Sequence, residues 1–223
     1  MSKQRICLLF DWDGTLAESH HAHYEAFRHT FQIHLGRRVE DSELAPIIGK
    51  TLREIMALFG AATEEQWLDF AADFYQHYYG HHKELVVLYP GVAEMVTRLQ
   101  EADLPMALVT SKPGAALARE VVYTGVAEAF TALVAYEDTE EHKPSPEPLL
   151  EALHRLGRRP EEALFIGDNA SDVVAGRAAG MPTILALWGS VAREEALAAR
   201  PDHVAETPQD LLAILADYIP RLR

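Results

Sequence analysis

The sequence has little cysteine, little positive charge and no long apolar run, and each shortage excludes a class of protein. Cys7 is the only cysteine among 223 residues, so no intrachain disulfide can form and a reducing compartment fits the chain. The 20 Lys and Arg residues are outnumbered by 34 Asp and Glu residues, which gives a formal net charge of −14. This balance argues against nucleic acid and against an anionic membrane surface as partners, because both require a basic face.

The apolar runs are too short for a signal peptide or a membrane span. The first extends only from Ile6 to Phe10 and acids follow it directly, whereas a spanning helix needs about 20 apolar residues. We therefore expect a cytoplasmic protein.

With 48% apolar residues the chain can bury a sizeable core, and its length suits one core domain with a smaller inserted one. Monomer and homodimer both stay open.

Short apolar runs alternate with helical patterns, which is typical of a doubly wound α/β protein with a parallel sheet. The expected strands are Arg5–Phe10, Met106–Val109, Ala132–Ala135, Ala163–Ile166 and Thr183–Leu187. The expected helices of this core are Val92–Glu101, Ala115–Val122, Pro148–Leu156 and Asp172–Ala179.

Residues 18–85 differ, because they contain helical patterns and no convincing strand. The patterns cover Tyr24–Leu35, Arg53–Phe59 and Glu64–Tyr79, and Thr63 with Gln66 predicts a capping box for the last. A stripe at helical spacing is expected to be buried: Trp67, Phe70, Phe74 and Tyr78. We predict a core domain of residues 1–17 and 86–223, and an all-helical cap of residues 18–85 inserted over the end of the first strand.

Polar side chains follow several of the expected strands, where parallel sheets bind their ligands. They are Asp11 and Asp13, Thr110 and Ser111, Lys143, and Asp168 with Asp172. Clustered carboxylates favour a hard dication, most simply Mg²⁺. A lysine and a hydroxyl offer charge and a donor to an anionic oxygen, as phosphoryl transfer requires, and a carboxylate can act as the nucleophile. The competing interpretation is that the acids belong to turns and helix caps.

Read together, these stretches resemble the haloacid dehalogenase superfamily, in its phosphoglycolate-phosphatase-like branch. The matching segments are DWDGTL, VTSKP, HKPSPEPLLEAL, FIGDNASDVVAGRAAGM, ALWG and the PDHV…LL tail, in family order. The resemblance implies a Rossmann-like core with a mobile helical cap of the C1 type. It also implies a Mg²⁺-dependent phosphatase that acts on a small phosphate ester through a phosphoaspartyl intermediate.

The resemblance also implies a role for each residue. Asp11 would be the nucleophile and Asp13 the general acid, then base; an acid at position 13 argues against a dehalogenase. Lys143 would stabilise the nucleophile and the phosphoryl group, which Thr110, or alternatively Ser111, would bind. The expected metal ligands are Asp11, Asp168 and the backbone carbonyl of Asp13, with Asp172 supporting the metal's waters or Lys143.

The helical insertion resembles the family weakly. Glu18 stands where relatives commonly have Asp, which would affect the cap hinge. His23 lies in HYEAF, similar to an HxxAW pattern of β-phosphoglucomutases and sugar phosphatases. Lys50 or Arg53 of GKTLRE would read an anionic end of the substrate, unless both are solvated helix charges.

The substrate stays open among phosphoglycolate, pyrophosphate, a sugar phosphate and a nucleotide. The alternatives in function are a phosphomutase of the β-phosphoglucomutase type, an inorganic pyrophosphatase, and a catalytically silent binding module. The intact set of acids argues against the last, because clustered, repelling carboxylates are costly without a task.

Overall fold

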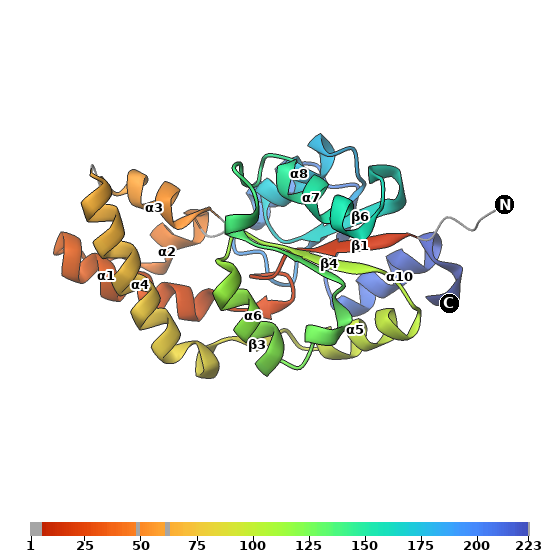
Figure 1. Ribbon diagram of the computed structural model, residues 1–223, viewed down its shortest axis with the longest axis horizontal. Coiled ribbons are helices and arrows are strands. Elements are labelled where there is room, and N and C mark those ends of the chain that lie inside the picture. Colours follow the sequence, from red (N-terminus) through yellow and green to blue (C-terminus); the bar gives the residue numbers. More distant parts are fainter. Residues whose placement is uncertain (1–5, 48–49, 61–62, 223) are drawn as a thin grey trace.

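The computed structural model describes residues 6–47, 50–60 and 63–222. Its centre is a parallel sheet of six strands in the order β5-β4-β1-β6-β7-β8 (Figure 1). The strands are β1 Cys7–Phe10, β4 Met106–Val109, β5 Ala132–Val134, β6 Ala163–Gly167, β7 Thr183–Ala186 and β8 His203–Ala205. In the central strand, Leu9 lies opposite Ala107 on one side and Phe165 on the other. The predicted α/β fold class is confirmed.

Helices cover both faces of the sheet (Figure 1). One face carries α5 Val92–Glu101, α6 Gly114–Tyr123 and α10 Pro208–Tyr218; the other carries α7 Glu147–Leu156, α8 Ala170–Ala178 and α9 Arg193–Ala198. Because successive side chains of a strand point to opposite faces, Leu8 and Phe10 join the first hydrophobic cluster while Cys7 and Leu9 join the second. Short 3₁₀ turns are η1 Ala45–Ile47, η2 Ala127–Ala129, η3 Tyr136–Asp138, η4 Pro160–Glu162 and η5 Pro220–Leu222.

The helical insertion consists of α1 His20–Leu35, α2 Asp41–Leu44, α3 Leu52–Leu58 and α4 Glu64–Leu85. The rings of Phe27 and Phe74 join α1 to α4 with centroids 4.7 Å apart. The predicted capping box is present, since the backbone N–H groups of Thr63 and Gln66 each donate to the other's side chain over 3.2 Å. Of the predicted stripe, Phe70, Phe74 and Tyr78 are buried and Trp67 is half-buried. No helix in the described ranges combines the length and the apolar character that a membrane span needs.

Two short strands lie at the ends of this insertion. β2 Ala17–Glu18 pairs antiparallel with β3 Val87–Leu88, and Tyr89 N–H donates to Leu16 O over 3.0 Å. We expected no strand here, because two residues are too few to show the alternation that identifies one. Glu18 therefore belongs to the paired connection between the insertion and the core.

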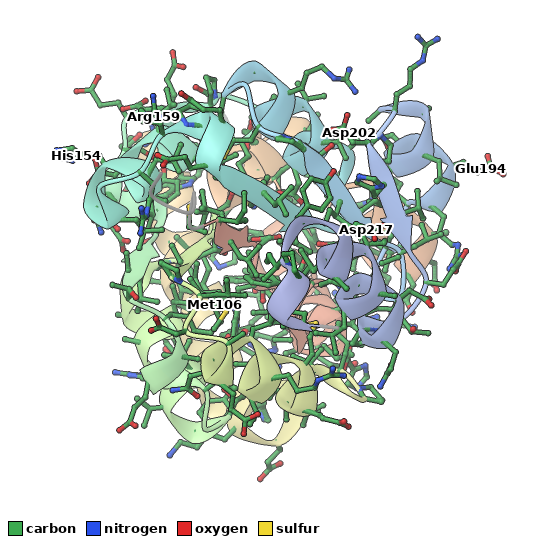
Figure 2. All side chains as sticks on the ribbon, turned by 90° about the vertical axis from the view of Figure 1, so that its right-hand side faces the viewer. Met106, His154, Arg159, Glu194, Asp202 and Asp217 are labelled. Carbon is green, nitrogen blue, oxygen red and sulfur yellow. The ribbon has the colours of Figure 1, made fainter. Side chains whose placement is uncertain are left out.

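The carboxyl ends of the parallel strands point toward the insertion. Figure 2 shows the molecule from the opposite end, with Met106 at the amino end of β4. The exposed side chains of His154 on α7 and Glu194 on α9 project from opposite edges of that view. The polar segments that follow the strands thus lie between the sheet and the helical insertion.

Candidate active site

The chain turns tightly as it leaves β1. Asp11 N–H still donates to Ile166 O of β6 over 2.9 Å, which fixes Asp11 immediately beyond the strand. The carbonyl of Trp12 then accepts from Leu16 and Ala17 N–H over 3.0 and 2.9 Å. Gly14 lies within this turn at φ +80°, and a Cβ there would be 2.4 Å from Asp168 Oδ2. Glycine is therefore required both by the left-handed backbone and by the approach of the Asp168 carboxylate.

Lys143 joins two of the predicted acids. Its buried Nζ lies 2.9 Å from Asp11 Oδ1 and 2.7 Å from Asp172 Oδ1, and it donates to Val109 O over 3.3 Å. Burial alone would lower the pKa of Lys143, but the two carboxylates outweigh burial and raise it. The lysine therefore carries a positive charge between the carboxyl ends of three strands.

Asp172 has two structural tasks. It lies at the third position of α8, where its Oδ2 accepts Asn169 N–H over 3.0 Å and completes a capping box. Its other oxygen holds Lys143. The interpretation as a cap and the predicted support of Lys143 are therefore compatible, because each uses a different oxygen.

Three buried carboxylates could hold a metal ion. One ligand oxygen each from Asp11, Asp168 and Asp172 lies within 4.8 Å of the others. Burial raises the pKa of Asp11 to about 7; Lys143 opposes this rise and Asp172 adds to it. Burial, together with the nearby carboxylates of Asp172 and Asp11, raises the pKa of Asp168 well above its usual value. An all-oxygen set with excess negative charge fits a hard dication, and Asp11 and Asp168 are the better placed ligands because Asp172 is already engaged.

Asp13 faces a different cation. Its Oδ1 lies 2.8 Å from the Nζ of Lys112, and Ser19 Oγ donates to it over 2.5 Å. Burial acts to raise the pKa of Asp13, but Lys112, His23 and Ser19 together outweigh burial and lower it to about 2. The environments of Asp11 and Asp13 thus push their pKa values in opposite directions, as is typical of acids with different roles.

Sequence reasoning missed Lys112 and its partner Glu120. Lys112 Nζ lies 2.7 Å from Glu120 Oε2 and donates to the Tyr78 hydroxyl of α4 over 2.7 Å. Glu120 is fully buried on α6 and also accepts from Trp12 Nε1 over 2.6 Å and from the Tyr78 hydroxyl over 2.7 Å. Lys112 follows Thr110 and Ser111 directly, and this position after a strand could have identified it as a site residue. No local pattern marked Glu120.

Thr110 and Ser111, the predicted phosphate ligands after β4, line the same cavity as the acids. Thr110 is buried; its N–H donates to Val134 O over 3.0 Å and its hydroxyl accepts Lys112 N–H over 3.2 Å. Thr110 and Ser111 line the cavity that also exposes Asp11, Asp13 and Lys143.

This cavity has a volume of about 80 Å³ and lies between the core and the helical insertion. Its lining residues from the core are Asp11, Asp13, Thr110, Ser111, Lys112, Pro113, Ala116, Lys143, Asn169, Ser171 and Asp172. Those from the insertion are His23, Phe27, Leu52, Ile55, Phe74, Tyr75 and Tyr78. The structure therefore brings most of the predicted residues to one cavity.

The three predicted residues of the insertion are placed differently. His23 lines the cavity; its Nδ1 donates to Ser19 O over 2.8 Å, and burial lowers its pKa to about 4. Arg53 is exposed, pairs with Glu64 over 2.6 Å and lies 4.7 Å over the ring of Trp67. Lys50 is exposed as well. Neither cation is among the described lining residues, and their contact with substrate stays a prediction.

Comparison with known proteins agrees with this geometry. Residues 8–186 match the family described as haloacid dehalogenase-like hydrolase. The chain is 33% identical over 210 residues to the pyrophosphatase PpaX of Bacillus cereus (strain AH820), covering 94% of this chain and 96% of that protein.

Solved structures share the whole architecture. A protein of Lactobacillus plantarum, provisionally assigned as a phosphoglycolate phosphatase, superposes with a TM-score of 0.85 at 27% identity, over 94% of this chain and 98% of that one. CbbY of Rhodobacter sphaeroides, in complex with phosphate, superposes with a TM-score of 0.82 at 26% identity, over 93% of this chain and 96% of that one. The chain belongs to the haloacid dehalogenase-like hydrolase family.

Proposed function

We propose that the protein is a Mg²⁺-dependent phosphatase that hydrolyses a small phosphate ester through a phosphorylated Asp11. The observation that carries this proposal is the pair Asp11 and Asp13, which share one cavity wall but face different lysines over 2.9 and 2.8 Å. The family match and the relatives named as phosphatases support the same reaction class.

Asp11 acts as the nucleophile in the first step. A carboxylate oxygen of Asp11 attacks phosphorus, the bond from phosphorus to the leaving oxygen breaks, and an acyl phosphate forms. Lys143 holds Asp11 Oδ1 in place and offsets charge on the phosphoryl oxygens, while Thr110 offers a further donor. Mg²⁺, held by Asp11 and Asp168, would supply positive charge at the nucleophile and at the phosphoryl oxygens.

Asp13 moves the proton in both steps. In the resting protein Lys112 keeps Asp13 ionised, which is the form that a general base needs. The negative charge of a bound phosphate ester raises the pKa of a neighbouring carboxyl group, so binding favours the acid form that protonates the leaving oxygen. Asp13 then takes a proton from the water that attacks the acyl phosphate, and inorganic phosphate leaves Asp11.

Hydrolysis of pyrophosphate is the second candidate. The observation in its favour is the name of the Bacillus cereus relative, which matches this chain almost from end to end. The same residues would act, with phosphate itself as the leaving group.

A metal-dependence assay tests the proposal. Phosphate release from phosphoglycolate, pyrophosphate, a sugar phosphate, a nucleotide and an aryl phosphate is measured in EDTA, Mg²⁺ and Ca²⁺. We expect turnover only with the dications, and poor turnover with Ca²⁺, which is larger and less strict in geometry. Asp11→Asn is the control for contaminating phosphatases. Full turnover by the wild type in EDTA would contradict the assignment.

A further inference from the structure

The half of the cavity that faces the phosphate-binding residues is aromatic and apolar. Its side chains come mainly from α1, α3 and α4 of the insertion: Phe27, Leu52, Ile55, Phe74, Tyr75, Tyr78, Pro113 and Ala116. The rings of Phe74 and Tyr75 meet edge to face with centroids 5.4 Å apart. A leaving group that occupies this half is therefore surrounded mostly by carbon.

The described lining contains two cationic side chains, and each is already balanced by two carboxylates. Lys143 lies 2.9 Å from Asp11 and 2.7 Å from Asp172. Lys112 lies 2.8 Å from Asp13 and 2.7 Å from Glu120. Both lysines are therefore already paired on the core side of the cavity, next to the phosphate-binding residues, and neither belongs to the apolar half.

His23 adds no positive charge to the lining. Its Nδ1 donates to Ser19 O over 2.8 Å, and burial lowers its pKa to about 4. The imidazole is therefore neutral near pH 7 and offers at most a hydrogen bond.

Two cations of the insertion, Arg53 and Arg28, form ion pairs with residues that do not line the cavity. On α3, Leu52 and Ile55 share a face, as residues three apart on a helix do, and both line the cavity. Arg53 between them is exposed and pairs with Glu64 over 2.6 Å. Arg28 on α1 pairs with Glu25 over 2.7 Å. The wall over the leaving group is thus built from the apolar side of α3.

A carboxylate or second phosphate in the apolar half of the cavity would lose its water without gaining a partner, which is costly. An aromatic or aliphatic group there would gain contact with rings and methyl groups. We propose that the leaving group is uncharged and carries an aromatic or other apolar part; this inference rests on the proposed phosphatase function. The substrate class is a monophosphate ester of such an alcohol, without a second anionic group.

A matched pair of esters tests this selectivity. Benzyl phosphate and 4-carboxybenzyl phosphate have leaving alcohols of similar acidity and differ by one carboxylate. With Mg²⁺ we expect kcat/KM for benzyl phosphate to be about 10- to 100-fold higher than for 4-carboxybenzyl phosphate. Apolar pockets typically discriminate between similar substrates by factors of this size. The ratio is measured again at high ionic strength, because the net charge of −14 repels any additional anion.

A single substitution should move the ratio. Leu52→Arg places a cation on the apolar wall and should shift the preference toward the carboxylated ester by about tenfold. The matched control is Leu58→Arg on the same helix, since Leu58 is 62% exposed and does not line the cavity. This control should keep the wild-type ratio.

The outcomes separate the two proposals. If wild type hydrolyses 4-carboxybenzyl phosphate, phosphoglycolate or pyrophosphate as well as benzyl phosphate, the uncharged leaving group is wrong and the phosphatase stands. If no phosphate ester is turned over with Mg²⁺, the proposed function is wrong and the inference falls with it. The kcat/KM ratio of the wild type for the two benzyl esters is sufficient to decide the inference. The test therefore does not depend on whether the Leu52→Arg protein folds.

Discussion

Asp11 and Asp13 are separated by one residue, yet each carboxylate is paired with a lysine from a different loop. Lys143 follows β5 and reaches Asp11, whereas Lys112 follows β4 and reaches Asp13. Burial without enough positive charge raises the pKa of Asp11, and the close lysine lowers that of Asp13. The difference in electrostatic surroundings moves the pKa values of the two acids in opposite directions within the same cavity.

Glu120 holds Lys112, the lysine that pairs with Asp13. It is fully buried and accepts hydrogen bonds from Trp12, Lys112 and Tyr78. Removing one partner of a buried ion pair typically costs about 3 to 5 kcal/mol. We therefore expect Glu120→Gln to lower the free energy of unfolding in urea by about that amount.

Glu128→Gln is the matched control for this prediction. Glu128 is exposed in the turn that follows α6, and such surface changes stay within about 0.5 kcal/mol. Equal stability of the two variants would show that the Glu120 network contributes nothing.

At the residue scale the sequence indicated the acids and Lys143 but missed Lys112, the partner of Asp13, and Glu120. Asp11, Thr110 and Lys143 were found because polar residues directly after strands meet at one edge of a parallel sheet. Glu120 could not be found, since its contacts with Trp12 and Tyr78 span 108 and 42 residues of chain and nothing local distinguishes it from a surface glutamate.

At the scale of elements, the loop after β7 supports the turn after β1. Trp188 Nε1 donates to Thr15 O over 2.9 Å, and a Cβ at Gly189 would be 1.7 Å from Gly14 O. His20 Nε2 at the start of α1 donates to Gly189 O over 3.0 Å. The loop thus contacts both the turn after β1 and the insertion.

Gly189→Ala should therefore displace the turn that carries the two acids. Forced overpacking typically costs about 1 to 3 kcal/mol, and we expect the variant to lose stability in urea and to lose kcat/KM on an aryl phosphate. Gly80→Ala is the control, because a Cβ at Gly80 on α4 meets nothing within 4 Å and alanine favours a helix. Wild-type activity of Gly189→Ala would contradict the proposed support of the turn.

Sequence patterns predicted the elements that leave a clear apolar signal. β4 and α5 have the predicted bounds, because a fully buried strand leaves a continuous apolar run and an amphipathic helix leaves a clear period. β8 has three residues and α9 six, too few for a period to show. α10 was missed although Thr207 caps it and Pro208 opens it, which is a signature that could have identified it.

At the scale of the whole molecule, the three buried carboxylates of Asp11, Asp168 and Asp172 repel one another, and we expect a bound dication to offset that repulsion and stabilise the fold. A ligand that binds only the folded state adds about 2.7 kcal/mol at a concentration 100 times its Kd. We expect Mg²⁺ to raise Tm in a saturable way. Sodium chloride at equal ionic strength controls for screening of the net charge of −14.

The variant Asp168→Asn assigns this effect to the cluster. Asp168 is buried and one of its oxygens lies within 4.8 Å of those of Asp11 and Asp172. The substitution should raise the metal-free Tm, because it removes a repelling carboxylate, and should abolish the response to Mg²⁺. An unchanged Mg²⁺ response would place the metal elsewhere.

Intact-mass spectrometry of acid-quenched protein shows whether Asp11 becomes phosphorylated during turnover. Loss of general acid–base help costs about 10² to 10⁴ in rate, so Asp13→Asn should still attack an aryl phosphate slowly and then stall, because the water also needs Asp13. We predict one added phosphoryl group on Asp11 in Asp13→Asn, and none in Asp11→Asn. A phosphoryl group on any other residue, or normal turnover by Asp11→Asn, would contradict the mechanism.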